Sequence, residues 1–207
     1  MKDIILNQNL LLGQTLRFDG DPFQSPWQQV TKHRHDGAVL IDAGHILEVG
    51  SREKLLKEFP EANITDYGND LIMPGFVDAH VHYPQTAIIA SWGKRLIDWL
   101  NLYTFPEEMR LSDPTYAGEV ADCYLDIALA HGTTTMASYC TTAPSSVNAY
   151  FETAGKRGMR VVGGKTCMDR NAPANLIDTA QRAYDESKEL IDRWHGKGRA
   201  IYAITPR

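Results

Sequence analysis

Two histidines, His80 and His82, stand two residues apart in the segment PGFVDAHVHYPQ, at the end of a run with strand-like composition. Because strand side chains alternate between two faces, both imidazoles are expected on the same face, where they can share one metal ion. Two imidazoles suit zinc or iron, and a catalytic zinc usually has three protein ligands and a water. The pair therefore predicts part of a metal site; the alternative is two histidines that only cap a strand by hydrogen bonds.

A second pair with the same spacing, His33 and His35 in KHRHDG, provides a comparison within the chain. This pair falls in a segment without hydrophobic periodicity. Lys32 and Arg34 are its direct neighbours in the sequence, and their positive charges disfavour a nearby cation. We predict that this pair is solvated surface. The other histidines lie at predicted helix ends or in a hairpin turn and are not expected to bind metal: His45, His131 and His195.

The elements that must position His80 and His82 alternate between strand-like and helix-like runs from about residue 70 onward. This alternation predicts βα units around a parallel sheet. Four strands are expected at 71–79, 133–139, 159–164 and 200–205, with helices at 114–132, 144–158 and 173–198. They predict an α/β fold in which residues 70–207 form the first half of a (β/α)8 TIM barrel, whose active sites lie at the carboxyl ends of the strands. The alternative is a complete four-stranded α/β domain.

Residues 1–69 are predicted to form a separate small β-rich domain, similar to a β-sandwich. An apolar stretch around Ile4–Leu6 and a hairpin in GAVLIDAGHILEVGS supply its strands. The two prolines of DGDPFQSPWQQVTKHRHDG predict a surface loop, and SREKLLKEFP predicts a short helix.

Composition excludes several classes of protein. The 207 residues carry a net charge of −5, which disfavours nucleic acid as a partner, and no long apolar run predicts a membrane span. The three cysteines are widely spaced and form no C-x-x-C motif, and the N-terminus lacks the pattern of a secretion signal. A reducing, cytoplasmic location is therefore predicted.

Several motifs together are more selective than H-x-H alone. PGFVDAHVHYPQ, the segment Gly132–Thr135 and the N-terminal β region resemble the amidohydrolase superfamily. Within that superfamily, LIDWLNLYTFPEEMR, MDRNAP and AITPR resemble the guanine deaminases, over most of residues 68–207. The resemblance implies an amidohydrolase-type metal-dependent barrel that hydrolyses guanine to xanthine and ammonia in purine catabolism, and a possible homodimer.

The resemblance also implies roles for individual residues. His80 and His82 correspond to zinc ligands, Gln85 to a residue that faces the purine, and Arg207 to a substrate-binding arginine suited to the O6 and N7 acceptors of guanine. Trp99 is a candidate to stack on the ring, although its spacing also fits a core residue. The family's remaining ligands and its catalytic glutamate would lie beyond Arg207, so we expect a truncated chain without catalytic residues of its own, and inactive alone.

Other interpretations remain open at this stage. A related amidohydrolase could deaminate or dechlorinate a pterin or triazine ring, or the chain could be a non-catalytic fragment. Lys165 follows the third predicted strand, where a lysine can indicate a bridged two-metal site. Because the fourth strand ends in Thr205-Pro206-Arg207 without a lysine, a single metal is favoured.

Overall fold

The computed structural model describes residues 8–207, which form two compact units, one ending at Pro74 and the other beginning at Gly75. We placed the domain boundary near residue 69 from the sequence. No helix in the described range combines the length and the apolar character that a membrane crossing needs.

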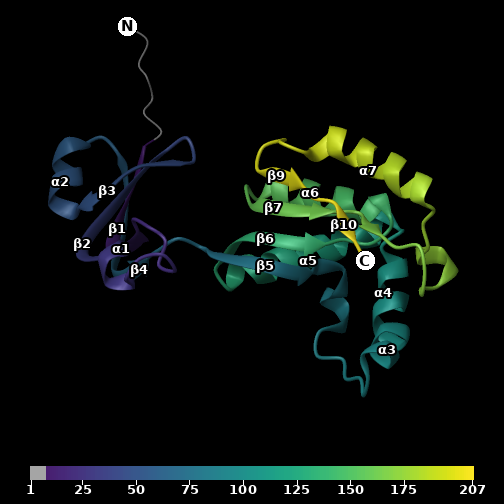
Figure 1. Cartoon of the computed structure of the whole chain (residues 1–207). Helices are drawn as coiled ribbons and strands as arrows, with labels where there is room; N and C mark the ends of the chain where they lie inside the picture. The colour runs from purple at the N-terminus through teal and green to yellow at the C-terminus, as the bar shows by residue number, and fades with distance from the viewer. Residues whose placement is uncertain (1–7) are drawn as a thin grey trace, which may run out of the picture. The chain divides into compact units, whose positions relative to one another are not determined.

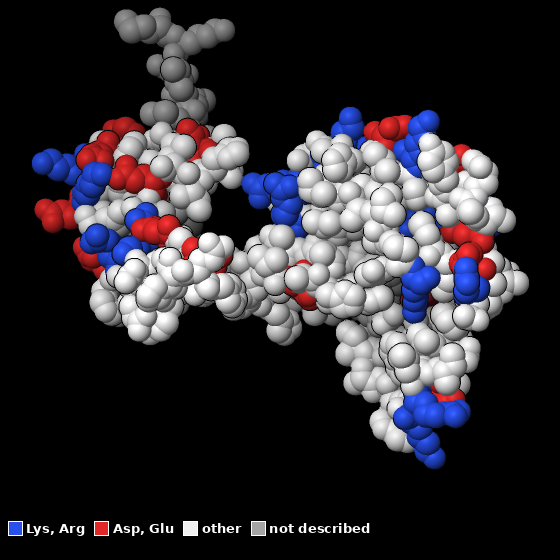
Figure 2. Space-filling view, in the orientation of Figure 1, with Lys and Arg blue, Asp and Glu red and all other residues white. Residues whose placement is uncertain are grey.

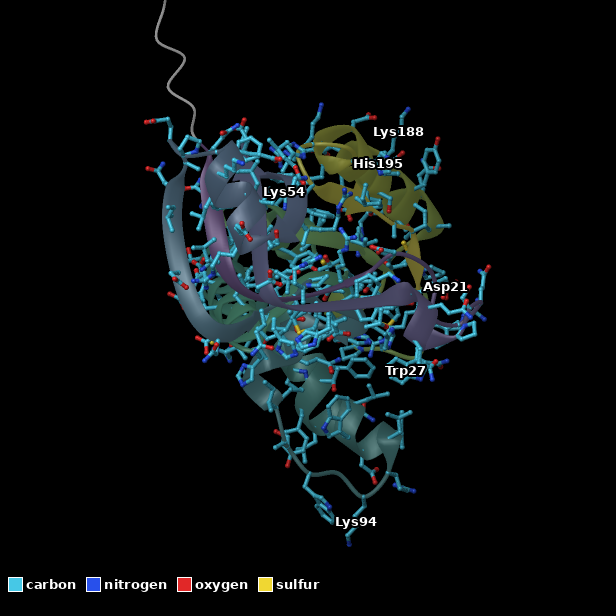
Figure 3. The ribbon with its side chains drawn as sticks, turned by 90° about the vertical axis from the view of Figure 1, so that its left-hand side faces the viewer. Asp21, Trp27, Lys54, Lys94, Lys188 and His195 are labelled. Atoms are coloured by element: carbon cyan, nitrogen blue, oxygen red, sulfur yellow. The ribbon has the colours of Figure 1, made fainter. Side chains whose placement is uncertain are left out.

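The first unit is a four-stranded sheet with the strand order β3-β2-β1-β4. Its elements are β1 (Asn9–Phe18), α1 (Trp27–Val30), β2 (Thr31–Asp42), β3 (His45–Ser51), α2 (Arg52–Glu58) and β4 (Asn63–Ile72). The predicted hairpin joins β2 to β3, and its turn residues Ala43 and Gly44 both have positive φ, as a two-residue hairpin turn requires. The predicted short helix is α2, whose first turn is capped by the Ser51 side chain. Lys54 of α2 is labelled in Figure 3.

The first unit differs from the sequence prediction in the segment between β1 and β2. The loop predicted for residues 19–37 is wrong from Trp27 onward, because Trp27–Val30 form α1 and residues 31–37 belong to β2, which pairs with β1. Cross-strand pairing thus overrides the weak strand propensity of this charged stretch. The strand predicted around Ile4–Leu6 lies outside the described residues.

The second unit contains a parallel sheet with the order β5-β6-β7-β9, and β8 pairs with β10 just beyond it (Figure 1). This arrangement confirms the α/β fold and the partial TIM barrel. Its elements are β5 (Phe76–His82), η1 (Tyr83–Ile88), α3 (Leu96–Trp99), the π-helix η2 (Leu100–Thr104), α4 (Phe105–Arg110), α5 (Pro114–Ala130), β6 (Thr133–Tyr139), α6 (Pro144–Lys156), β7 (Arg160–Gly164), β8 (Thr166–Cys167), η3 (Ala174–Leu176), α7 (Ala180–Trp194), β9 (Ala200–Tyr202) and β10 (Thr205–Pro206).

The three long helices cover the strands and enclose the main core. The buried side chains at its centre come from α5, β6, α6 and β7: Leu125, Met136, Tyr150, Phe151 and Val161. Helix α7 begins at Ala180, seven residues later than predicted, because residues 174–176 form a separate 3-10 turn after Pro173 and Thr179 caps the long helix.

The single strand predicted at 71–79 is wrong, because the chain leaves β4 at Ile72 and starts β5 at Phe76. Gly75 lies in the connection, where a β-carbon would overlap the side chain of Thr134. Along β5 the pairing with β6 gains one residue between Asp78 and Val81, which is a β-bulge. The bulge is directly before the end of the strand, where His80 and His82 lie.

Helices α3 and α4 lie beyond the carboxyl ends of the strands, and α4 lies next to the last residues of the chain (Figure 1). Lys94 marks the tip of this projecting segment (Figure 3), and Figure 2 shows a small group of charged side chains there. Arg95 and Asp98 form an ion pair of 2.7 Å in this segment. The long connection after β5 thus builds a wall beside the strand ends that carry the candidate site.

Candidate metal and ring-binding site

His80 and His82 lie close together at the end of β5. Their ring centroids are 5.3 Å apart and their planes are nearly perpendicular. Tyr139, the last residue of the neighbouring strand β6, stacks on His82 at 4.9 Å and packs edge-on against His80 at 5.7 Å. The structure therefore brings both predicted ligands to one side of the sheet, where the Tyr139 ring orients them.

The surroundings of His82 keep its imidazole neutral. Burial lowers the pKa of His82 to about 4, and electrostatic interactions with Arg207 and His80 act in the same direction. A neutral imidazole has a free lone pair, which is the form that binds a metal ion. The donor chemistry of this residue therefore fits a metal ligand at neutral pH.

Asp78 precedes the bulge and has a structural contact. Its Oδ1 accepts a hydrogen bond of 3.1 Å from the backbone N–H of His80. The carboxylate thereby holds the bulged backbone that presents the first histidine. Of the two roles open to Asp78 from the sequence, orienting a histidine ring or satisfying backbone groups, this contact corresponds to the second.

The two imidazoles are an incomplete metal site. Among the residues that the structure describes, no group of three His, Cys, Asp or Glu side chains is placed to hold one ion. A catalytic zinc ordinarily uses three protein ligands. The ligand type and the shared face fit a metal, and the described residues supply two of the ligands.

A cavity of about 290 Å³ opens beside His82. Gln85 and Trp99 both line it, together with Val81 and Tyr124. Trp99 is half-buried and donates a hydrogen bond of 3.2 Å from its indole N–H to the Ser91 carbonyl oxygen, so its ring is fixed at the wall. The predicted ring-binding residues Gln85 and Trp99 therefore share one cavity with a predicted metal ligand.

Arg207 is joined to Gln85 by the carboxylate of Glu108, a residue that the sequence analysis did not single out. Its Nη1 donates to both oxygens of Glu108 in α4, at 3.0 and 2.9 Å, and the amide Nε2 of Gln85 donates to Glu108 Oε1 at 3.2 Å. Glu108 is only 2% exposed. The pKa of Glu108 is raised overall, because burial is the largest influence on it and outweighs the lowering by Arg207 and Gln85. One buried carboxylate thus joins the two residues that were assigned to the substrate.

Two further contacts position Arg207, one through its backbone and one with the ring of Phe105. Its N–H donates to the Cys167 carbonyl oxygen at 3.0 Å, and its guanidinium carbon lies 5.7 Å from the centre of the Phe105 ring. The arginine is therefore held from the end of β8 and from α4. The available sequence signal for Glu108 was a pair of acids in an otherwise apolar segment, FPEEMR, which does not say which acid is turned inward.

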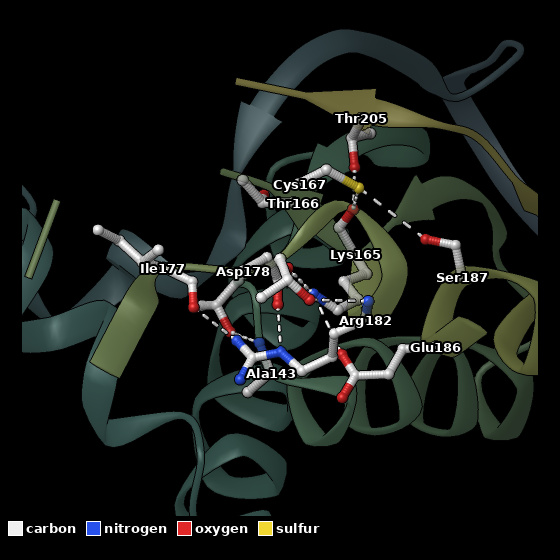
Figure 4. A network of polar contacts seen from close by, with 12 residues as sticks. Ala143, Lys165, Thr166, Cys167, Ile177, Asp178, Arg182, Glu186, Ser187 and Thr205 are labelled. Atoms are coloured by element: carbon white, nitrogen blue, oxygen red, sulfur yellow. Dashed lines mark hydrogen bonds and ion pairs between the residues drawn. The ribbon is translucent and has the colours of Figure 1, made fainter. Parts of the chain in front are cut away.

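Lys165 belongs to a buried network, shown in Figure 4. Its ammonium contacts the carboxylate of Asp178 and lies 3.2 Å from Glu186, while Arg182 binds the other oxygen of Asp178 at 2.5 Å. These partners satisfy the lysine within the fold. Cys140 is also fully buried, and its burial raises the pKa of the thiol well above its usual range, which keeps it protonated and unreactive.

Comparisons with known proteins show the family and the fold of the chain. The Amidohydrolase family matches residues 71–206, and the Imidazolonepropionase-like composite domain of bacteria matches residues 37–62. The guanine deaminase of Escherichia coli K12 is 46% identical over 173 residues, which are 83% of this chain and 39% of that protein.

Two solved structures are similar over almost the whole chain. The crystal structure of guanine deaminase from Bradyrhizobium japonicum has a TM-score of 0.93 at 39% identity and covers 98% of this chain and 44% of its own. The guanine deaminase of C. acetobutylicum, solved with guanine bound in its active site, has a TM-score of 0.82 at 26% identity and covers 97% and 46%. The chain thus spans less than half the length of these relatives. The family model matches about two thirds of the sequence, and the fold is that of the solved guanine deaminase structures. The chain therefore belongs to the amidohydrolase family.

Proposed function

We propose that the protein to which this chain contributes is a zinc-dependent guanine deaminase. The observation that carries the proposal is the convergence of Gln85 and Arg207 beside the cavity that His82 lines. An arginine and a glutamine together offer donors and an acceptor, which is the pattern that the edge of guanine requires. The similarity to guanine deaminases supports this substrate over other rings.

In this proposal His80 and His82 hold the metal, and family membership points to a metal cofactor. A bound zinc ion would lower the pKa of a water molecule and so supply the nucleophile at neutral pH. Gln85 and Arg207 bind and orient the ring, and Trp99 forms an apolar wall that limits access of bulk water. The reaction adds water at the carbon that carries the amine, breaks the C–N bond and releases ammonia, so that guanine becomes xanthine.

A reducing, cytoplasmic location and a role in purine catabolism complete the proposal. All three cysteines, Cys123, Cys140 and Cys167, are free thiols, which supports a reducing compartment. The homodimer that the resemblance implies stays a prediction.

The competing candidate is a related amidohydrolase that acts on another aminated or chlorinated ring. A triazine hydrolase variant has a similar structure, with a TM-score of 0.78, but its identity of 23% supports the fold alone. The cavity of about 290 Å³ is large enough for a single or a fused ring, so its volume does not distinguish the two candidates. The paired donors of Arg207 are the feature that favours guanine, because they need adjacent acceptors on the ring.

Ammonia release from a panel of aminated rings tests the proposal. Purified full-length protein loaded with zinc is incubated with guanine, adenine, a pterin and an aminotriazine, and ammonia is measured over time. We expect guanine to give the highest kcat/KM. Adenine and the aminotriazine lack a carbonyl oxygen and a ring N–H beside the reacting amine, whereas the pterin has both groups on a larger ring system and so tests the shape of the cavity. Turnover of the triazine or pterin without turnover of guanine would reject the assignment.

A further inference from the structure

Glu108 stands between the two residues that we assign to the substrate and touches both of them. It is nearly inaccessible to solvent, on α4, and lies outside the motif that carries the histidines. Both of its hydrogen bonds to Arg207 start from Nη1, which leaves Nε and Nη2 to other partners. The contact therefore holds one nitrogen of the guanidinium group and leaves its other donors available.

The contact with Gln85 has a further consequence for the amide. An ionised carboxylate only accepts hydrogen bonds, so the amide group must turn its NH2 toward Glu108. The side-chain NH2 of Gln85 lies 3.2 Å from Glu108 Oε1 in this orientation. The amide oxygen is then left for the cavity that Gln85 lines. A glutamine, which can present either group, is thereby restricted to acting as an acceptor.

We propose that Glu108 is a positioning residue that sets the donor and acceptor pattern of the ring-binding wall. This inference rests on the proposed guanine deaminase function and adds a determinant of specificity to it. With Glu108 in place, Arg207 presents donors and Gln85 presents an oxygen acceptor, side by side. That pattern is complementary to a carbonyl oxygen next to a ring N–H, as in O6 and N1–H of guanine, and not to the amine and bare ring nitrogen of adenine.

The neighbouring acid Glu107 provides a matched control. It is also buried, at 5% exposure, and lies in the same helix turn. Its carboxylate is bound by Arg110 at 2.8 Å and by the Tyr116 hydroxyl at 2.5 Å, and it contacts neither Gln85 nor Arg207. Glu107→Gln therefore reports what loss of a buried charge from α4 does to the fold, while Glu108→Gln also removes the restriction on the amide.

The experiment compares wild-type, Glu108→Gln and Glu107→Gln full-length protein loaded with zinc. Steady-state kinetics with guanine give kcat and KM, and competition by hypoxanthine and adenine gives their inhibition constants. Hypoxanthine carries the carbonyl and N–H of guanine at this edge, and adenine carries the reversed pattern. A change in the ratio of the two inhibition constants is a readout that a purely structural role would not move.

For Glu108→Gln we expect KM for guanine to rise about tenfold, the loss typical of a hydrogen bond to a charged group, with a smaller change in kcat. The preference for hypoxanthine over adenine should shrink about tenfold, because the amide of Gln85 can then turn either way. Glu107→Gln should keep the wild-type KM and the wild-type preference.

The outcomes separate the two proposals. Wild-type turnover of guanine with equal KM and preference in both variants would overturn the role of Glu108 and leave the deaminase function standing. Absence of guanine turnover in the wild type would reject the function, and the inference with it. If Glu108→Gln does not fold, Gln85→Ala replaces it. Removal of the amide must then reduce the preference for hypoxanthine, because only the donors of Arg207 remain to discriminate, and an unchanged preference refutes the inference.

Discussion

Lys165 forms a buried ion pair that supports the candidate site from outside it. Its side chain is 0% exposed, and its partner Asp178 is 4% exposed. Asp178 ends the segment 168–178, and its N–H donates to the Met168 carbonyl oxygen at 2.7 Å. Met168 and Leu176 of the same segment pack on Phe105 in α4. The ion pair thus closes the segment that supports the helix carrying Glu108.

Replacement of Lys165 by Met should destabilise the protein strongly. The change removes the ammonium that lies between two carboxylates, so that Asp178 keeps only Arg182 as a partner and Glu186 loses its contact with the lysine. Breaking a buried pair typically costs up to about 3–5 kcal/mol. Urea-induced unfolding of the full-length protein measures the loss. Arg170→Met, which removes an exposed arginine paired with Asp169, is the control and should leave the transition midpoint unchanged. Equal midpoints for the Lys165 variant and the wild type would mean that the ion pair does not hold this segment.

At the scale of elements, the end of β7 determines where the chain's last residues lie. The N–H of Ala203 donates to Gly163 at 2.8 Å, and a β-carbon on Gly164 would overlap the carbonyl oxygen of Ala203. Only glycine permits this approach of the two strands. The contact carries β10 alongside β8 and so brings Arg207 to Glu108.

Gly164→Ala is therefore expected to push the segment 203–207 away from β7. Overpacking of this kind typically costs about 1–3 kcal/mol, and guanine binding should weaken because Arg207 moves with the segment. Gly118→Ala in α5 is the matched control, because nothing lies within 4 Å of the new methyl group and alanine is favoured in a helix by about 0.5–1 kcal/mol. The unfolding midpoint should fall for Gly164→Ala and not for Gly118→Ala. A fall in both variants, or in neither, would contradict the role assigned to Gly164.

Periodicity and turn residues predicted most of the barrel elements from the sequence. Strand β6 has the predicted bounds, and α5 and α6 begin at the predicted prolines. The strand across Met73–Gly75 was predicted wrongly, because its apolar run continues through the change from one sheet to the next. The residues 31–36 of β2 were missed since charged residues have weak strand propensity, and only pairing with β1 makes them a strand.

The site was predictable to a similar extent. The H-x-H spacing placed His80 and His82 on one face, and the rings do lie together, although the bulge between Asp78 and Val81, which includes His80, was not foreseen. Glu108 and Tyr139 could not be assigned, because their contacts join segments far apart in the chain. Long-range contacts of this kind leave no trace in local spacing.

At the scale of the whole molecule, the chain contributes a β-rich unit and a half-barrel, and it spans 39% of the length of its Escherichia coli relative. The central claim is that a metal ion is held by the pair on β5. The chain contains its own control pair, His33 and His35, with the same spacing on β2 and a ring separation of 4.5 Å. Those rings lie in the exposed part of the strand and share the amide oxygen of Gln14, at 3.0 and 3.1 Å.

The most direct test is the zinc content of purified full-length protein after dialysis, measured for the wild type and two double variants. We predict about one zinc per chain in the wild type, as expected for a single-metal site. We predict the same value for His33→Ala/His35→Ala, and a near-complete loss for His80→Ala/His82→Ala that retains the wild-type circular dichroism spectrum. Full zinc content in the His80→Ala/His82→Ala protein, or loss of zinc from the His33→Ala/His35→Ala protein instead, would contradict the account.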